Sequence, residues 1–121
     1  FEQSVERAFG MFASRIEQGA RTVPMMMAAL SAYHAGISQV VVTGDPAAPA
    51  TRALNEVVAR RYLPFAITIP LVNEHAASLA RLLPWTEAMA QRVEASAAYV
   101  CRNFACLTPA TSAEELIGQL G

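Results

Sequence analysis

The sequence predicts an α/β protein: an N-terminal helical hairpin followed by a small three-layer, Rossmann-like domain with about three mainly parallel strands. Two stretches with apolar residues at helical spacing open the chain, and short β-branched or apolar runs then alternate with amphipathic helices. This alternation is typical of parallel strands joined by right-handed crossovers. We therefore divide the 121 residues into a hairpin at 1–36 and an α/β domain at 37–121.

Composition narrows the class of protein. The chain is 54% hydrophobic and 16% charged, so it can fill a core and is not disordered. No apolar run approaches the roughly 18 residues of a membrane span. The net charge of −1 and the dispersed arginines argue against a nucleic acid or an anionic membrane as partner. We expect a fragment of a longer protein, because residue 1 is phenylalanine and not a start methionine. We expect it to be cytoplasmic, because no signal peptide is apparent.

Residues 3–17 are predicted to form the first helix. Ser4 is the candidate N-cap and Gly19 the C′ residue. Its apolar face has four members at helical spacing: Val5, Phe9, Phe12 and Ile16.

A second helix is expected to begin near Thr22, with Pro24 in its first turn, and to end at Gly36. A short loop between two helices gives an antiparallel hairpin. The second helix is apolar on most of its circumference: Met25, Met26, Met27, Leu30 and Tyr33. The three methionines are typical either of core packing, which we favour, or of an adaptable groove for a partner.

The β-branched run at 39–43 predicts a buried strand that ends in a turn at 44–46. An amphipathic helix is expected at 49–62. Its predicted inward face consists of Leu54, Val57, Val58 and Tyr62.

The second strand is expected at 65–69, bracketed by Pro64 and Pro70, where a lost ladder hydrogen bond is tolerable. A helix at 74–83 should follow. Its predicted inward residues are Leu79, Leu82 and Leu83.

Residues 84–96 have no clear period and fit either a further helical turn or a loop. A third strand is predicted at 97–101. The last helix is expected at 113–120, capped by Ser112 or Thr111.

The turn that contains Gly44 and Asp45 is a candidate ligand site. It follows a predicted strand and precedes a helix, which is where open α/β sheets bind ligands. A dinucleotide site needs three glycines at fixed spacing, and this turn has one. An ordinary turn with Asp45 or Thr51 as a helix cap is the favoured interpretation.

Cys101 and Cys106 are the only cysteines and are separated by four residues. Two reduced structural cysteines at the end of a buried strand are the leading interpretation. A disulfide or a regulatory thiol pair is the first alternative, since Arg102 would lower a neighbouring thiol pKa. A zinc site is the second, but zinc needs two further ligands, and the two histidines, His34 and His75, lie far apart in sequence.

No catalytic residue, cofactor site or resident metal site is predicted. The sequence has no nucleophile elbow, HExxH motif or P-loop. Enzymatic activity is therefore left open, and Trp85 is expected to lie in the core or at an interface.

Three stretches carry a resemblance: residues 40–46 (VVVTGDP) with 51–54 (TRAL), residues 99–106 (YVCRNFAC) and residues 109–116 (PATSAEEL). In this order they resemble the carboxyl-terminal region of the YyaL-type, thioredoxin-domain-containing family, which is related to a spermatogenesis-associated protein of animals. The resemblance covers roughly residues 22–120, and the cysteine segment is its most specific part.

The resemblance implies that the redox and sugar-binding centres of the family lie outside these residues. It also implies that residues 1–36 are the end of an α/α barrel and residues 37–121 a tail domain. We therefore expect a packing or interaction role. The expected partner is the barrel portion of a parent protein or, in isolation, a second copy bound through the N-terminal helices.

Overall fold

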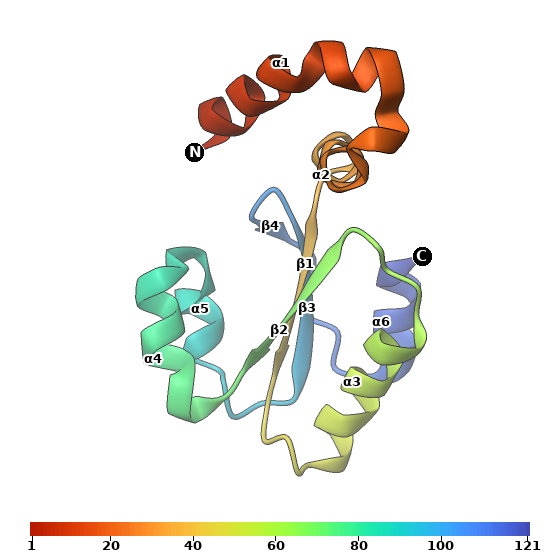
Figure 1. Cartoon of the computed structure of the whole chain (residues 1–121). Helices are drawn as coiled ribbons and strands as arrows, with labels where there is room; N and C mark the ends of the chain where they lie inside the picture. Colours follow the sequence, from red (N-terminus) through yellow and green to blue (C-terminus); the bar gives the residue numbers. More distant parts are fainter. The chain divides into compact units, whose positions relative to one another are not determined.

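A computed structural model describes residues 1–121, which divide into two compact units, 1–36 and 37–121 (Figure 1). The first unit ends at Gly36, whose φ of +73° lies in the left-handed region that favours glycine. The elements are, in chain order, α1 (Glu2–Gly19), η1 (Ala20–Thr22), α2 (Pro24–Ala35), β1 (Ser38–Thr43), α3 (Pro49–Arg60), β2 (Ala66–Leu71), α4 (Asn73–Leu82), η2 (Pro84–Thr86), α5 (Glu87–Ala90), β3 (Ala97–Arg102), β4 (Ala105–Cys106) and α6 (Ala113–Leu120).

The first unit is a pair of helices in contact along one side. The predicted apolar face of α1 is half-buried, and the ring of Phe9 lies edge-on to that of Tyr33, with centroids 5.5 Å apart. The Tyr33 hydroxyl donates a hydrogen bond of 2.8 Å to Glu6, and this bond raises the pKa of Tyr33. No residue of α1 or α2 is fully buried. None of the helices in the chain combines the length and the apolar composition needed to cross a membrane.

Both ends of α1 differ from the prediction. The helix begins at Glu2, so Ser4 lies within its first turn and caps nothing. Gly19 is the last helical residue, but its φ of −172° is extended backbone, not the left-handed conformation of a C′ glycine. The Thr22 hydroxyl instead donates to the Gly19 carbonyl oxygen at 2.7 Å, which satisfies one of the free carbonyls at this end.

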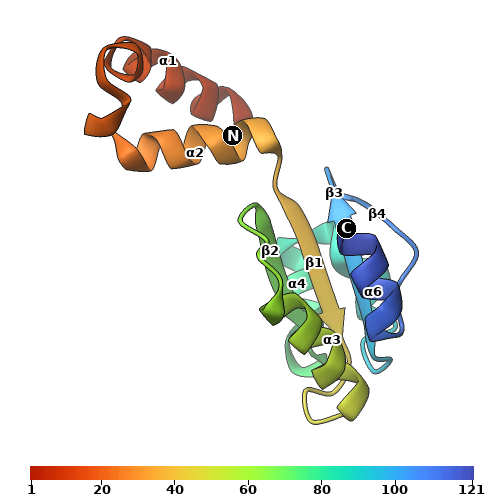
Figure 2. The same ribbon diagram turned by 90° about the vertical axis from the view of Figure 1, so that its right-hand side faces the viewer.

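The second unit contains a four-stranded sheet with the order β2-β1-β3-β4 (Figure 2). Only β1 and β2 are parallel; β3 is antiparallel to both β1 and β4. The α/β class is therefore confirmed, but the expectation of a mainly parallel, Rossmann-like sheet is wrong.

The segment between α4 and β3 explains why β3 reverses. Residues 84–96, for which the sequence fits either a helical turn or a loop, form η2, α5 and a turn. They bring the chain to the carboxyl end of β1. There the Gly44 amide donates to the Val93 carbonyl oxygen at 2.9 Å, and the Thr43 hydroxyl donates to that of Ala95 at 2.6 Å. The next strand starts beside the end of β1 and must run antiparallel to it.

Helices cover both faces of the sheet, with α3 and α6 on one face and α4 and α5 on the other (Figures 1 and 2). On the α3/α6 face the buried cluster consists of Val40, Val42, Leu54, Ala98, Val100, Ala110 and Leu116. On the α4/α5 face it consists of Val41, Leu71, Ala76, Met89, Val93, Ala97, Tyr99 and Cys101. Neighbouring residues of β1 thus belong to different cores, as the period of two along a strand requires.

Three residues depart from their predicted positions. Tyr62 is 90% exposed because α3 ends at Arg60, and Leu82, the last residue of α4, is 77% exposed. Pro70 lies within β2, which extends to Leu71. Since β2 is an outer strand of the sheet, the missing N–H of Pro70 is tolerated there.

The start of α6 is stabilised by two side chains, as the sequence predicts for Ser112. The Ser112 hydroxyl accepts a hydrogen bond from the Glu115 amide at 3.2 Å. The Glu115 carboxylate in turn accepts from the Thr111 amide at 2.7 Å, and this bond lowers the pKa of Glu115 below its ordinary value. Replacing Ser112 with alanine is expected to lower the free energy of unfolding by about 1 kcal/mol.

The Glu115 pKa also predicts a dependence of stability on pH. Its folded-state pKa is depressed, so its contribution is present above the ordinary pKa and is lost as pH falls through the folded-state pKa. Urea unfolding of Glu115→Gln between pH 7 and pH 3 should show a smaller loss of stability than the wild type. The control Glu114→Gln removes a carboxylate from the same turn but none of these bonds. An equal effect from both variants would contradict the assignment.

Candidate functional site

The two candidate sites from the sequence lie at opposite ends of the sheet. Cys101 pairs with Gln39 near the start of β1, whereas Gly44 and Asp45 follow Thr43 at its end. At about 3.3 Å per strand residue, these ends are more than 10 Å apart, so the residues do not form one site.

Gly44 and Asp45 line a cavity of about 470 Å³, formed where β1 and β2 end. It is lined by Gly44, Asp45, Pro46, Val72, Asn73, Glu74, Val93 and Glu94. Asp45 accepts a hydrogen bond from the Ala47 amide at 2.8 Å, so its carboxylate closes the turn, and the N-cap residue of α3 is Ala48. Thr51 is hydrogen-bonded to Ser96 at 2.8 Å and is not a cap either.

The charges around this cavity do not suit a phosphate. Asp45, Glu74 and Glu94 contribute three carboxylates, and no arginine or histidine lines it. These carboxylates would repel the negatively charged phosphates of a nucleotide, even where backbone amides of the turn donated hydrogen bonds to them. The lining of this cavity therefore disfavours a phosphate or nucleotide at the turn.

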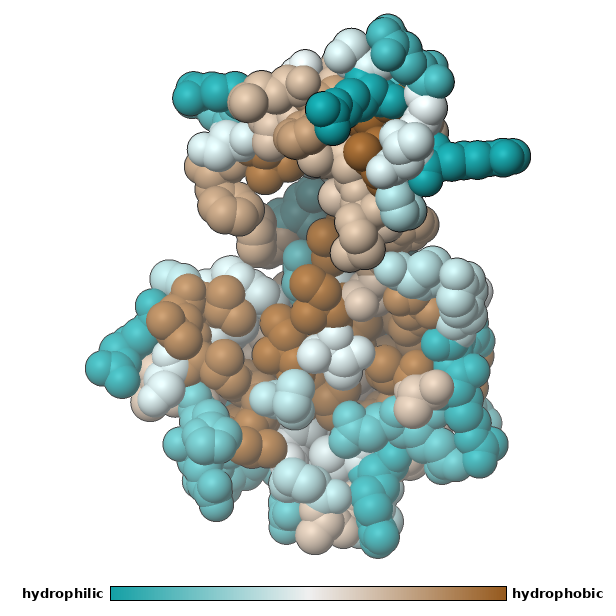
Figure 3. All heavy atoms as spheres, in the orientation of Figure 1, coloured by the Kyte–Doolittle hydropathy of each residue, from teal (hydrophilic) through white to brown (hydrophobic).

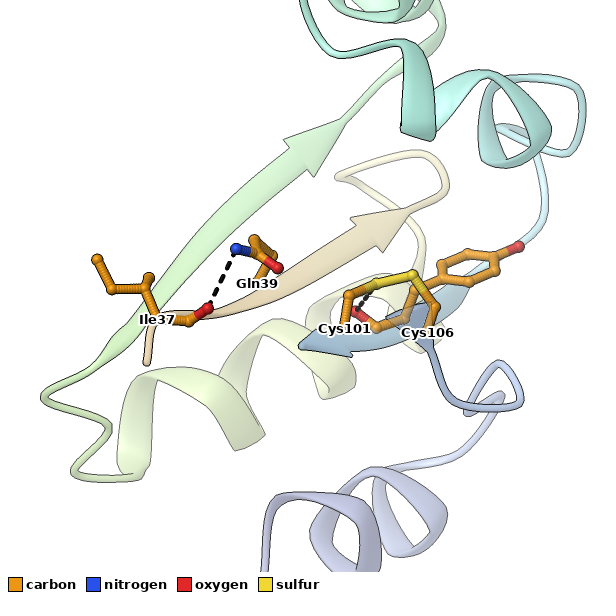
Figure 4. The surroundings of a disulfide bond; sticks show 5 residues. Ile37, Gln39, Cys101 and Cys106 are labelled. Atoms are coloured by element: carbon orange, nitrogen blue, oxygen red, sulfur yellow. Dashed lines mark hydrogen bonds between the residues drawn. A yellow bond between two sulfur atoms is a disulfide. The ribbon is translucent and has the colours of Figure 1, made fainter. Parts of the chain in front are cut away.

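The cysteines close a β-hairpin. Cys101 on β3 lies directly opposite Cys106 on β4, with Cα atoms 3.9 Å apart, and the two sulfurs are bonded (Figure 4). The leading interpretation of two reduced cysteines is therefore wrong for this structure. A spacing of four residues fits a hairpin in which a two-residue turn brings both cysteines face to face.

The disulfide argues against a zinc site at Cys101 and Cys106. Neither sulfur is a free thiolate, and no group of three or more His, Cys, Asp or Glu residues is placed to hold a metal ion. His34 and His75 are both exposed, on different units.

The turn of this hairpin was not predicted. Asn103 and Phe104 have φ angles of +49° and +63°, which is the pattern of a type I′ turn. Asparagine tolerates this conformation, but phenylalanine adopts it at a cost. The usual sequence signal, glycine after asparagine, is absent. Phe104 is 66% exposed, and its ring centroid lies 5.9 Å from that of Trp85.

The two halves of the cystine have different surroundings. Cys101 is completely buried in the core on the α4/α5 face, whereas Cys106 is exposed. The Cys101 sulfur is 3.9 Å from the Tyr99 carbonyl oxygen.

Gln39 is a polar neighbour of Cys101 that sequence reasoning missed. It lies opposite Cys101 in the register, and in Figure 4 its side chain lies on the same side of the sheet as the cystine. Its amide nitrogen donates to the Ile37 carbonyl oxygen at 3.2 Å, while its Oε1 is buried without a hydrogen-bond partner. One polar residue in the otherwise β-branched run 39–43 was the available signal.

Comparison with known proteins finds similarity to longer proteins. The chain is 33% identical to spermatogenesis-associated protein 20 of Homo sapiens over 105 residues, and 31% and 30% identical to the proteins of that name from Rattus norvegicus and Mus musculus. Each match covers 87% of this chain and 13% of the relative. The chain thus spans about an eighth of the length of these curated relatives. No family model and no solved structure matches.

Proposed function

We propose that this chain is the carboxyl-terminal region of a longer, cytoplasmic protein of the YyaL-type, thioredoxin-domain-containing family, with a non-catalytic packing role. The support is that 105 residues of this chain are similar to spermatogenesis-associated protein 20. The match covers only 13% of that longer protein. The motif around Cys101 and Cys106 is the most specific sequence feature behind the proposal.

The helical hairpin carries the proposal. A unit of 36 residues is below the size at which a single core is normally sufficient, and no residue of α1 or α2 is fully buried. Met11 is 76% exposed and Met25 is 81% exposed. In Figure 3 apolar side chains reach the surface of this unit. We propose that the exposed surface of this hairpin is covered by the preceding α/α-barrel segment of the same longer protein.

Isolated residues 1–121 are then expected to self-associate through the hairpin. Sedimentation velocity over a concentration series should show reversible association, because the exposed apolar surface lacks its partner. The double variant Met11→Glu, Met25→Glu should stay monomeric. The control Tyr62→Glu changes a residue of the other unit that is 90% exposed, and this variant should associate like the wild type. A wild-type chain that is monomeric at its highest soluble concentration would contradict the proposal.

A redox role of the cysteine pair is a second candidate function, favoured by the disulfide of the hairpin. Its test is the number of free thiols in the denatured chain, prepared without reductant and alkylated. The expected result is no alkylated cysteine before reduction and two afterwards. Full alkylation of both without reductant would eliminate this candidate.

A further inference from the structure

We propose that the Cys101–Cys106 disulfide is a directional thiol–disulfide exchange site. An incoming thiolate attacks the Cys106 sulfur, and Cys101 is the leaving group. This inference rests on the second candidate function above. It adds which of the two sulfurs is attacked and which one leaves.

The direction follows from burial. A thiolate attacks a disulfide along the sulfur–sulfur axis, from the side opposite the leaving sulfur. An approach to Cys106 comes from solvent, since Cys106 is exposed. An approach to Cys101 has to pass through the core, because Cys101 is 0% exposed and packs with Val41 and Tyr99.

The surroundings of Cys101 fit a protonated thiol. The Tyr99 carbonyl oxygen, 3.9 Å from the sulfur, is an acceptor that an S–H group can use and a disulfide sulfur cannot. The buried Oε1 of Gln39, on the strand position opposite Cys101, has no donor in the oxidised structure. Reduction creates one S–H group at Cys101, which can donate to only one of these two oxygens at a time. Because a buried acceptor without a partner is costly, this donor favours the reduced state.

The hairpin turn provides a second reason for reversibility. The backbone at Phe104 has a φ of +63°, which is unfavourable for a residue with a side chain. The disulfide holds the ends of this turn together, and reduction lets the turn relax. In the reducing cytoplasm proposed above, disulfides are rare except where they are transient and functional.

The exchange balances with two equivalents of a thiol, RSH. The first thiolate bonds to the Cys106 sulfur, the disulfide bond breaks, and its electron pair leaves on Cys101, which takes a proton from solvent. A second thiolate attacks the R sulfur of the mixed disulfide and releases Cys106 as a thiolate, which takes a proton from solvent. The products are RSSR and two cysteine thiols, so two electrons pass from RSH to the cystine.

The test uses the oxidised chain and reduced glutathione as the probe. Brief exposure, acid quenching, alkylation and peptide mass mapping should place the glutathione adduct on Cys106 and the alkyl group on Cys101. The emission of Trp85, the only tryptophan, should change as the Phe104 turn relaxes. An adduct mainly on Cys101 would overturn the direction of exchange. A folded chain that resists glutathione, although its urea-unfolded form is reduced, would show a purely structural disulfide.

Gln39→Leu tests the acceptor independently of the cysteines. At a fixed ratio of reduced to oxidised glutathione, this variant should contain a several-fold lower proportion of reduced to oxidised chain than the wild type. The control Gln91→Leu changes an exposed glutamine and should match the wild type. Equal proportions in all three chains would remove Gln39 from the proposal. If the thiol count shows no disulfide, the redox role itself fails; if exchange occurs at Cys101, only its direction fails.

Discussion

Replacing Gly44 with alanine is expected to destabilise the α/β unit by roughly 2–6 kcal/mol, a large part of the stability of a small domain. Gly44 has a φ of +110°, a conformation that residues with side chains rarely adopt. A Cβ atom there would overlap the Thr51 hydroxyl and would lie 2.9 Å from the Ser96 Cα atom, which is backbone. The Gly44 amide also donates to Val93, so the junction between β1 and β3 has little room to adjust.

Gly118→Ala is the matched control. Gly118 lies within α6, and a Cβ atom added there would meet no neighbouring side chain within 4 Å. Alanine is the better helix former, so this variant should gain about 0.5–1 kcal/mol. Urea denaturation monitored by circular dichroism measures both. A Gly44→Ala midpoint equal to that of the wild type would show that this turn is not as described.

Replacing Leu116 with alanine is expected to cost about 2–5 kcal/mol. Leu116 is 0% exposed and packs in the cluster on the α3/α6 face with Leu54 and Val100. Deleting its side chain leaves a cavity that the β-branched residues of the sheet are too stiff to fill.

The adjacent residue provides the comparison. Ile117 is on the same helix but is 43% exposed, so Ile117→Ala should cost clearly less than Leu116→Ala. Thermal unfolding of both variants checks the difference. Equal costs would mean that α6 does not present Leu116 to the sheet.

The strands and helices with strong periodicity were predictable from sequence. The β-branched residues Val40–Val42 and the Ser112 cap lie where the patterns placed them. Helix ends were less predictable, because apolar residues such as Tyr62 and Leu82 continue the pattern past the last packed turn. Strand direction was not predictable, since alternation of strands and helices does not say at which end of the sheet a helical segment returns the chain.

The candidate site was predictable only in part. The sequence identified Cys101 and Cys106 as a pair but not their oxidation state, because a spacing of four residues fits reduced, oxidised and metal-bound forms. The turn at Asn103 and Phe104 was not predictable, because phenylalanine occupies the position where glycine is usual. Gln39 becomes informative only when the register places it opposite Cys101.

The two outer strands of the sheet have features that disfavour strand addition between molecules. An outer strand offers unpaired amides and carbonyls to strands of other molecules, and long, flat edges promote stacking between chains. Here β2 carries Pro70, which has no amide hydrogen to offer, and β4 is only two residues long and closed by a turn and a cystine. Neither edge is a good template for strand addition. The reversible self-association proposed for the hairpin would then involve helical surfaces and not the strand edges.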